Sequence, residues 1–188
     1  RWQNVAAWLA KAVTGRSIEI IAAAPHIHSV LQGRPSDYFV RHAYFKSRVP
    51  KPDRADPDRD RCGLIWFAPV VPMTGTHVHK VLDLTAPLFV QYGFDHYAAL
   101  LIQNPRAMIV LMSIFFDFEN PEQVRNTSQL YDALSHATTL AGYQPYRVGT
   151  AGMAKLAETA PEFNAFLTRL KHAIDPGGVL APGKYGVS

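Results

Sequence analysis

The pattern of hydrophobic and polar positions is clearest in the middle of the chain, where four elements follow one another. Residues 64–71 are nearly all apolar, as expected of a buried strand. Between residues 76 and 92 the apolar positions recur every three or four residues, which is typical of an amphipathic helix. Two further apolar runs, 96–102 and 108–118, are separated by an Asn-Pro-Arg turn and predict a β-hairpin.

The next stretch supplies a second helix and a fourth strand. Asn120 is a good helix N-cap, Pro121 suits the first helical position, and the helix is expected to stop at Gly142. Residues 146–148 then predict a strand. The order strand–helix–strand–strand–helix–strand is that of an α+β fold, a ferredoxin-like antiparallel sheet with helices on one face, here extended by N- and C-terminal segments.

Weaker patterns flank this core. Before it we expect a helix, a strand and a short helix, at residues 2–13, 17–21 and 26–33. An irregular excursion rich in Pro, Asp and Arg follows, up to residue 61. After the core, a final helix is predicted by an apolar stripe of Phe163, Phe166, Leu167, Leu170 and Ile174. The chain is therefore divided into three regions, 1–60, 61–174 and 175–188.

Composition excludes several classes of protein. Hydrophobic residues make up 48% of the 188 residues, enough for a packed core, and no apolar run is long enough to span a bilayer. The net charge is +4, and basic residues are concentrated at 48–61, but acids alternate with them there, so we interpret this stretch as a solvated loop and not a nucleic-acid site. The single cysteine, Cys62, excludes an internal disulfide framework. It fits a reducing compartment such as the cytoplasm, but the localisation is left undetermined.

Few motifs carry chemistry. The histidine pairs His26/His28 and His77/His79 are spaced two apart, which does not make a metal clamp on a helix, and we expect no metal site. The dipeptide Tyr146-Arg147 places a phenol donor beside a fixed cation, which is suited to binding an anion. The alternative is a tyrosine packed on the sheet edge with an arginine in solvent. These residues alone leave both readings open.

A set of short motifs changes that balance. In order they are IWFAPV at 65–70, NPRAM at 104–108, NPE at 120–122, GYQPYRV at 142–148, AIDP at 173–176 and LAPGKYGV at 180–187. Their order and spacing resemble the cap region of the flavoprotein family of vanillyl-alcohol oxidase and 4-cresol dehydrogenase (p-cresol methylhydroxylase). By this resemblance residues 1–60 are the remainder of the cap, 61–174 its ferredoxin-like core, and 175–188 a tail directed toward an FAD-binding domain outside this sequence.

The resemblance implies an activity and a site. Members of the family oxidise para-alkyl phenols, with hydride transfer from the benzylic carbon to flavin N5. Tyr146 would donate to the phenolate oxygen, Arg147 would lie near that oxygen and the flavin, and Lys184 would contact the cofactor. The implied partners are a phenolic substrate, the N-terminal FAD-binding domain, a cytochrome c subunit in the dehydrogenases, and a second copy in a homodimer. The segment alone is expected to be inactive.

Departures from the family pattern modify this expectation. Leu64 stands where one branch carries the histidine linked to flavin, and no tyrosine lies between Phe45 and Cys62. FAD is therefore expected to be non-covalent, unless Cys62 forms a thioether. A family His-His pair is Ile109-Val110 here, and a family glutamate is Leu100, which predicts a more apolar pocket. The competing hypothesis is a free-standing ferredoxin-like module that binds a ligand or regulates another protein.

Overall fold

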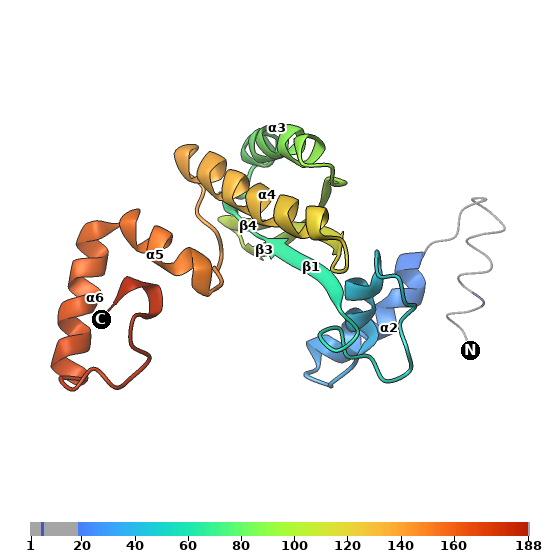
Figure 1. Cartoon of the computed structure of the whole chain (residues 1–188), viewed down its shortest axis with the longest axis horizontal. Coiled ribbons are helices and arrows are strands. Elements are labelled where there is room, and N and C mark those ends of the chain that lie inside the picture. Colours follow the sequence, from blue (N-terminus) through green and yellow to red (C-terminus); the bar gives the residue numbers. More distant parts are fainter. Residues whose placement is uncertain (1–4, 6–18, 188) are drawn as a thin grey trace. The chain divides into compact units, whose positions relative to one another are not determined.

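The computed structural model describes Val5 and residues 19–187 (Figure 1). The elements in chain order are α2 (Glu19–Leu31), η1 (Tyr38–Tyr44), β1 (Cys62–Phe67), β2 (Val70–Pro72), α3 (Gly75–Gln91), β3 (Tyr97–Asn104), β4 (Ala107–Asp117), α4 (Pro121–Leu140), α5 (Thr150–Glu158), α6 (Pro161–Ile174) and η2 (Lys184–Gly186). They form two compact units. One contains the residues up to Leu64 with Phe115–Arg125, and the other contains Ile65–Ile114 with the residues from Asn126 onward.

The sheet is centred on β4. On one side β3 runs antiparallel to it, from Tyr97 opposite Ser113 to Asn104 opposite Ala107. On the other side lie β1 and β2, with Val70 opposite Ile109. A single antiparallel bridge joins Pro69 to Pro145. It lies beside β1 and β2, where the last strand of the predicted fold would pair. The predicted α+β class is confirmed, whereas the ferredoxin-like topology is present only in part, because its last strand is reduced to this bridge.

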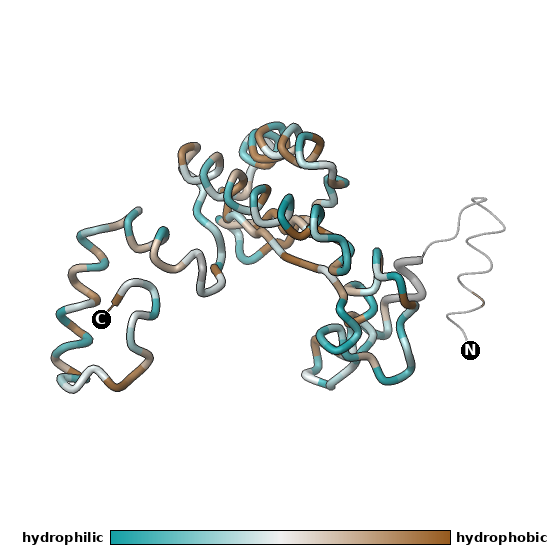
Figure 2. The backbone as a smooth tube through the Cα atoms, in the orientation of Figure 1, coloured by the Kyte–Doolittle hydropathy of each residue, from teal (hydrophilic) through white to brown (hydrophobic). Residues whose placement is uncertain are grey.

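Helices α3 and α4 lie on the same side of the sheet in Figure 1. Each buries one stripe with helical spacing: Val78, Val81, Thr85 and Phe89 in α3, and Thr127, Leu130, Leu134 and Thr138 in α4. Val71, Val110, Met112 and Ile114 of the strands are buried with them. Figure 2 shows the hydrophobic residues concentrated along the strands, and this is where the core lies. Both core helices and the hairpin are therefore as predicted.

Other predicted elements differ. Residues 146–148 form no strand, since Pro145 has no N–H to continue the ladder. Helix α5 was not predicted. The expected strand at 17–21 is wrong for residues 19–21, which begin α2; there the run continues into three alanines, and alanine favours helix. Residues 17 and 18 and the expected helix at 2–13 lie outside the described residues, apart from Val5.

The excursion before β1 is anchored by one buried phenol. The Tyr44 hydroxyl donates to Asp60 Oδ2 at 2.7 Å and accepts the backbone N–H of Asp56 at 2.9 Å. Burial, together with the neighbouring carboxylate, raises the pKa of Tyr44 to about 12. Asp60 also pairs with Arg59 at 3.0 Å. The later half of the excursion is therefore tied to η1 by specific polar contacts.

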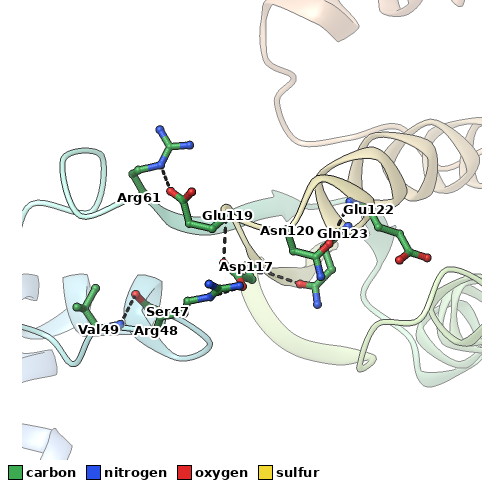
Figure 3. Close-up of polar contacts among 9 residues, drawn as sticks. All are labelled: Ser47, Arg48, Val49, Arg61, Asp117, Glu119, Asn120, Glu122 and Gln123. Carbon is green, nitrogen blue, oxygen red and sulfur yellow. Dashed lines mark hydrogen bonds and ion pairs between the residues drawn. The ribbon is translucent and has the colours of Figure 1, made fainter.

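Figure 3 shows a second set of polar contacts where β4 ends and α4 begins. Asn120 accepts the N–H groups of Glu122 at 3.0 Å and Gln123 at 3.3 Å, so its predicted N-cap role is confirmed. Arg48 donates to Asp117 Oδ2 at 2.6 Å, and Arg61 pairs with Glu119. These arginines of the basic loop are thus paired with acids from a distant part of the sequence.

Candidate functional site

The segment that carries Tyr146 and Arg147 leaves α4 through a tight turn. Gly142 has a positive φ of 86°, a conformation that favours glycine, and the N–H of Tyr143 bonds to the carbonyl of Thr138 at 2.8 Å. The chain then reaches the sheet, where the N–H of Tyr146 donates to the carbonyl of Ala68 at 2.7 Å. Tyr146 is therefore the last residue held by the sheet before the chain turns away.

Tyr146 and Arg147 lie together and face solvent. The Arg147 guanidinium carbon lies 5.0 Å from the centroid of the Tyr146 ring, and 51% of Tyr146 is exposed. Within residues 19–187 the Arg147 side chain makes no ion pair, so its N–H donors remain available. The pair therefore exposes a phenol and a guanidinium, both hydrogen-bond donors, at one place on the surface.

The alternation along β1 and β2 indicates which exposed residue shares a face with Tyr146. Along β1 and β2 the buried residues alternate with more accessible ones, and Phe67, Pro69 and Val71 point toward the helices. Pro145 shares their face because it bridges Pro69. By the same alternation, Tyr146 projects on the opposite face, with Trp66. Trp66 is 58% exposed, so this face carries two exposed aromatic rings.

Lys184, the third predicted site residue, lies in the short helix η2. Its side chain is exposed and makes no contact with Tyr146 or Arg147 among the described residues. Gly186 packs so closely on α5 that an added β-carbon would lie 2.7 Å from the β-carbon of Ala157. The structure therefore unites two of the three predicted residues and places the third on a separate, packed segment.

Asp175 organises that C-terminal segment, and sequence reasoning gave it no role. Its carboxylate accepts from Lys171 Nζ at 2.6 Å and from the N–H groups of Val179 and Leu180 at 3.0 and 2.9 Å. Lys171 also donates to the carbonyl of Leu180 at 2.8 Å. The lysine and the backbone donors lower the pKa of Asp175 to about 2. The spacing of four between Lys171 and Asp175 was the available signal.

Loss of the Asp175 charge is expected to loosen this segment. Because its pKa in the folded protein is about 2, below the ordinary 3.8, its contribution is complete above about pH 4 and is lost as the pH falls through 2. Asp175→Asn should lower the thermal midpoint at pH 7 by a few degrees. Between pH 4 and 2 the midpoint of the variant should decrease less than that of the wild type. Thermal unfolding at several pH values checks this. Asp132→Asn, which breaks an exposed pair with Lys155, should leave that fall intact.

The family departures cluster at one place in the sheet. Leu100 of β3 lies directly opposite Val110 of β4, and the neighbouring Ile109 is also buried. Ile109 and Val110 are consecutive, so their side chains lie on opposite faces of β4, and only Val110 shares a face with Leu100. Within residues 19–187 no group of three or more His, Cys, Asp or Glu residues could hold a metal ion. Cys62 is a half-buried free thiol.

Sequence reasoning also missed a contact of Tyr143, which precedes Tyr146 and Arg147 in the chain. The Tyr143 hydroxyl lies 2.7 Å from Nδ1 of His77, a residue of α3. These two positions are 66 residues apart, so only the folded topology could reveal the contact.

Among the helices of the described residues, none is long and apolar enough to cross a membrane.

Comparisons with known proteins show which proteins the chain resembles. No family model matches the chain. The chain is 32% identical over 162 residues to 1'-carboxy-chondrochloren decarboxylase of Chondromyces crocatus, covering 86% of this chain and 29% of that protein. It is 31% identical over 126 residues to the 4-cresol dehydrogenase (hydroxylating) flavoprotein subunit of Pseudomonas putida, covering 66% of this chain and 24% of that protein.

Two solved structures resemble the fold. The crystal structure of p-cresol methylhydroxylase with substrate bound matches with a TM-score of 0.63 at 29% identity, over 67% of this chain and 24% of that one. An isoeugenol complex of 4-ethylphenol oxidase from Gulosibacter chungangensis matches with a TM-score of 0.61 at 28% identity, over 66% and 24%. The chain spans between 24% and 29% of the length of these proteins. In sequence and in fold, the chain is therefore similar to one part of the 4-cresol dehydrogenase flavoproteins.

Proposed function

We propose that the chain is the substrate-capping part of an FAD-linked oxidoreductase that oxidises para-substituted phenols. The observation that carries this proposal is the exposed Tyr146-Arg147 pair, in a chain whose relatives act on 4-cresol and 4-ethylphenol by name. A phenol has a pKa near 10, so binding it as an anion at neutral pH requires donors directed at its oxygen. A tyrosine hydroxyl and a guanidinium supply such donors.

The residues present fit a flavin and a phenolate at this face. When bound, FAD would accept a hydride from the benzylic carbon of the substrate. Arg147 would stabilise negative charge on the phenolate oxygen and on the flavin edge, because its donors are unpaired and its charge is fixed. Trp66 and Tyr146 offer exposed rings against which a planar ligand can pack. Lys184 is proposed as a further contact to the cofactor.

Exposed apolar surface supports a partner domain. No residue of α6 is buried, although Phe163, Phe166, Leu170 and Ile174 form a stripe along it. Leu100, Leu101 and Ile102 of the edge strand β3 are also exposed. Apolar surfaces of this kind are usually covered in a native protein. We therefore propose that an FAD-binding domain of the same protein covers them, and that this chain alone is inactive.

The electron acceptor distinguishes two versions of the proposal. The 4-cresol dehydrogenase relative is named as a flavoprotein subunit, which favours a partner subunit such as a cytochrome c. The 4-ethylphenol relative is named as an oxidase, which favours oxygen. Rapid reoxidation of the reduced protein by air would select the second version. A homodimer is compatible with both.

A second candidate function is decarboxylation of a carboxylated substrate. It is favoured by the decarboxylase relative, which aligns over 86% of the chain. The apolar replacement at Leu100, Ile109 and Val110 also removes groups that the phenol-oxidising pattern would use. Release of carbon dioxide from a para-substituted phenol with a carboxylated side chain would favour this candidate.

The cofactor part of the proposal predicts a specific spectrum. Full-length protein should show the visible absorbance of an oxidised flavin. Acid precipitation should release the yellow colour into the supernatant, because neither Leu64 nor the tyrosine-free stretch before Cys62 offers a link. Colour that stays in the pellet would contradict non-covalent binding, and a colourless native protein would contradict the flavin assignment.

A further inference from the structure

The turn that precedes Tyr146 is held from a second direction, by α3. Tyr143 is only 4% exposed, and its hydroxyl shares a hydrogen bond of 2.7 Å with Nδ1 of His77, the third residue of α3. The two rings also meet edge to face, with centroids 5.8 Å apart at 85°. The contact therefore joins the start of α3 to the turn that follows α4.

The segment needs this support because its attachment to the sheet is short. The carbonyl of Gln144 accepts from the N–H of Val70 at 2.8 Å, and the N–H of Tyr146 donates to Ala68 at 2.7 Å. These two bonds flank the single bridge at Pro145, and no regular strand continues beyond it. Backbone pairing of this length opens easily when nothing else restrains it.

We propose that His77 is a positioning residue for the Tyr146-Arg147 site and acts through Tyr143. The inference rests on the proposed function of that site. Tyr143 is fixed by the α4 turn and by His77, and Tyr146 follows three residues later, at the end of the bridged segment. Donors that bind a phenolate must be held within about 0.5 Å of their working geometry. The hydrogen bond at Tyr143, three residues before Tyr146, can therefore control ligand affinity without touching the ligand.

The test measures ligand affinity in the full-length protein. The probe is 4-chlorophenol, a para-substituted phenol with no benzylic hydrogen, followed through the flavin absorbance. Tyr143→Phe keeps the ring and removes the hydroxyl, and His77→Leu removes the ring nitrogen. Each should raise the Kd about tenfold, as expected when a partly buried hydrogen bond is lost. The double variant should show the same tenfold change, because both substitutions remove one contact.

Two controls separate positioning from general damage. His77→Asn places an amide oxygen near the position of Nδ1 and should keep the Kd within about threefold of the wild type. His79→Leu alters an exposed histidine of the same helix and should leave the Kd unchanged. Hydrogen exchange at the amides of Val70 and Tyr146 should accelerate in Tyr143→Phe but not in His79→Leu. If His77→Leu does not fold, Tyr143→Phe carries the test.

The outcomes distinguish this inference from the proposed function. If Tyr146→Phe and Arg147→Ala weaken binding while Tyr143→Phe and His77→Leu do not, the positioning role is overturned and the site remains. If none of the four variants changes the Kd, the proposed site itself fails. Additive effects of Tyr143→Phe and His77→Leu would also overturn the inference, because the two residues would then act separately.

Discussion

Arg147→Ala in the full-length protein should slow flavin reduction by 4-cresol by on the order of a hundredfold, the usual cost of removing one donor from a developing anion. The reason is that Arg147 makes no ion pair in the described part of the chain, so its charge is free to serve the ligand. Tyr146→Phe should have a smaller effect of about tenfold, because a neutral donor is lost while the ring remains. Anaerobic stopped-flow absorbance measures both rates.

Arg125→Ala provides the matched control for charge. Arg125 is exposed on α4 and is not part of the proposed site, so its removal should leave the reduction rate within about twofold of the wild type. Reduction rates that are unchanged in both Arg147→Ala and Tyr146→Phe would contradict the roles proposed for this pair. Equal losses in Arg125→Ala and Arg147→Ala would show that the effect comes from net charge alone.

Gly63→Ala is the substitution expected to damage the fold most. A β-carbon at this position would lie 2.1 Å from the carbonyl oxygen of Phe116 and 2.8 Å from its ring. Gly63 therefore permits β1 to approach β4 closely, and any side chain would force the two strands apart. We expect the free energy of unfolding to fall by about 3 kcal/mol, at the upper end for overpacking. Chemical denaturation monitored by circular dichroism measures it.

Gly75→Ala is the matched control for that experiment. Gly75 is the first residue of α3, its φ is not positive, and an added β-carbon would meet no atom within 4 Å. The same chemical change should therefore be neutral or slightly stabilising there, since alanine is the better helix former. A fall of similar size in both variants would contradict the close-approach explanation for Gly63.

The parts of the fold that the sequence predicted are those with strong local signals. The hairpin was predicted from two apolar runs and a turn, and Asn104 indeed accepts the N–H groups of Arg106 and Ala107 at 2.8 and 3.0 Å. Asn120 was predicted as a cap from its own side chain. The predicted strand at 64–71 splits into β1 and β2 on either side of Ala68 and Pro69, and Pro69 was the local signal for this interruption.

The parts that failed depend on distant partners. Whether residues 146–148 pair as a strand is decided by the edge available beside Ala68 and Pro69, and Pro145 limits that pairing to one bridge. The chemical character of Tyr146 and Arg147 was legible because they are adjacent in sequence. The contact between His77 and Tyr143 could not be predicted in the same way, because the two residues are 66 positions apart and meet only in the folded topology. The hydrogen bond between Tyr44 and Asp60 likewise joins residues that are not neighbours in the sequence.

The central claim, that this chain caps a flavin at which phenols are oxidised, is tested most directly by anaerobic reduction of the full-length protein. 4-Cresol or 4-ethylphenol is added without oxygen, and the flavin absorbance is followed. We predict bleaching by these phenols and none by 4-methylanisole, whose methylated oxygen cannot become an anion for Tyr146 and Arg147 to bind. A flavin that stays oxidised with every 4-alkylphenol, or that bleaches equally with the methyl ether, would contradict the account.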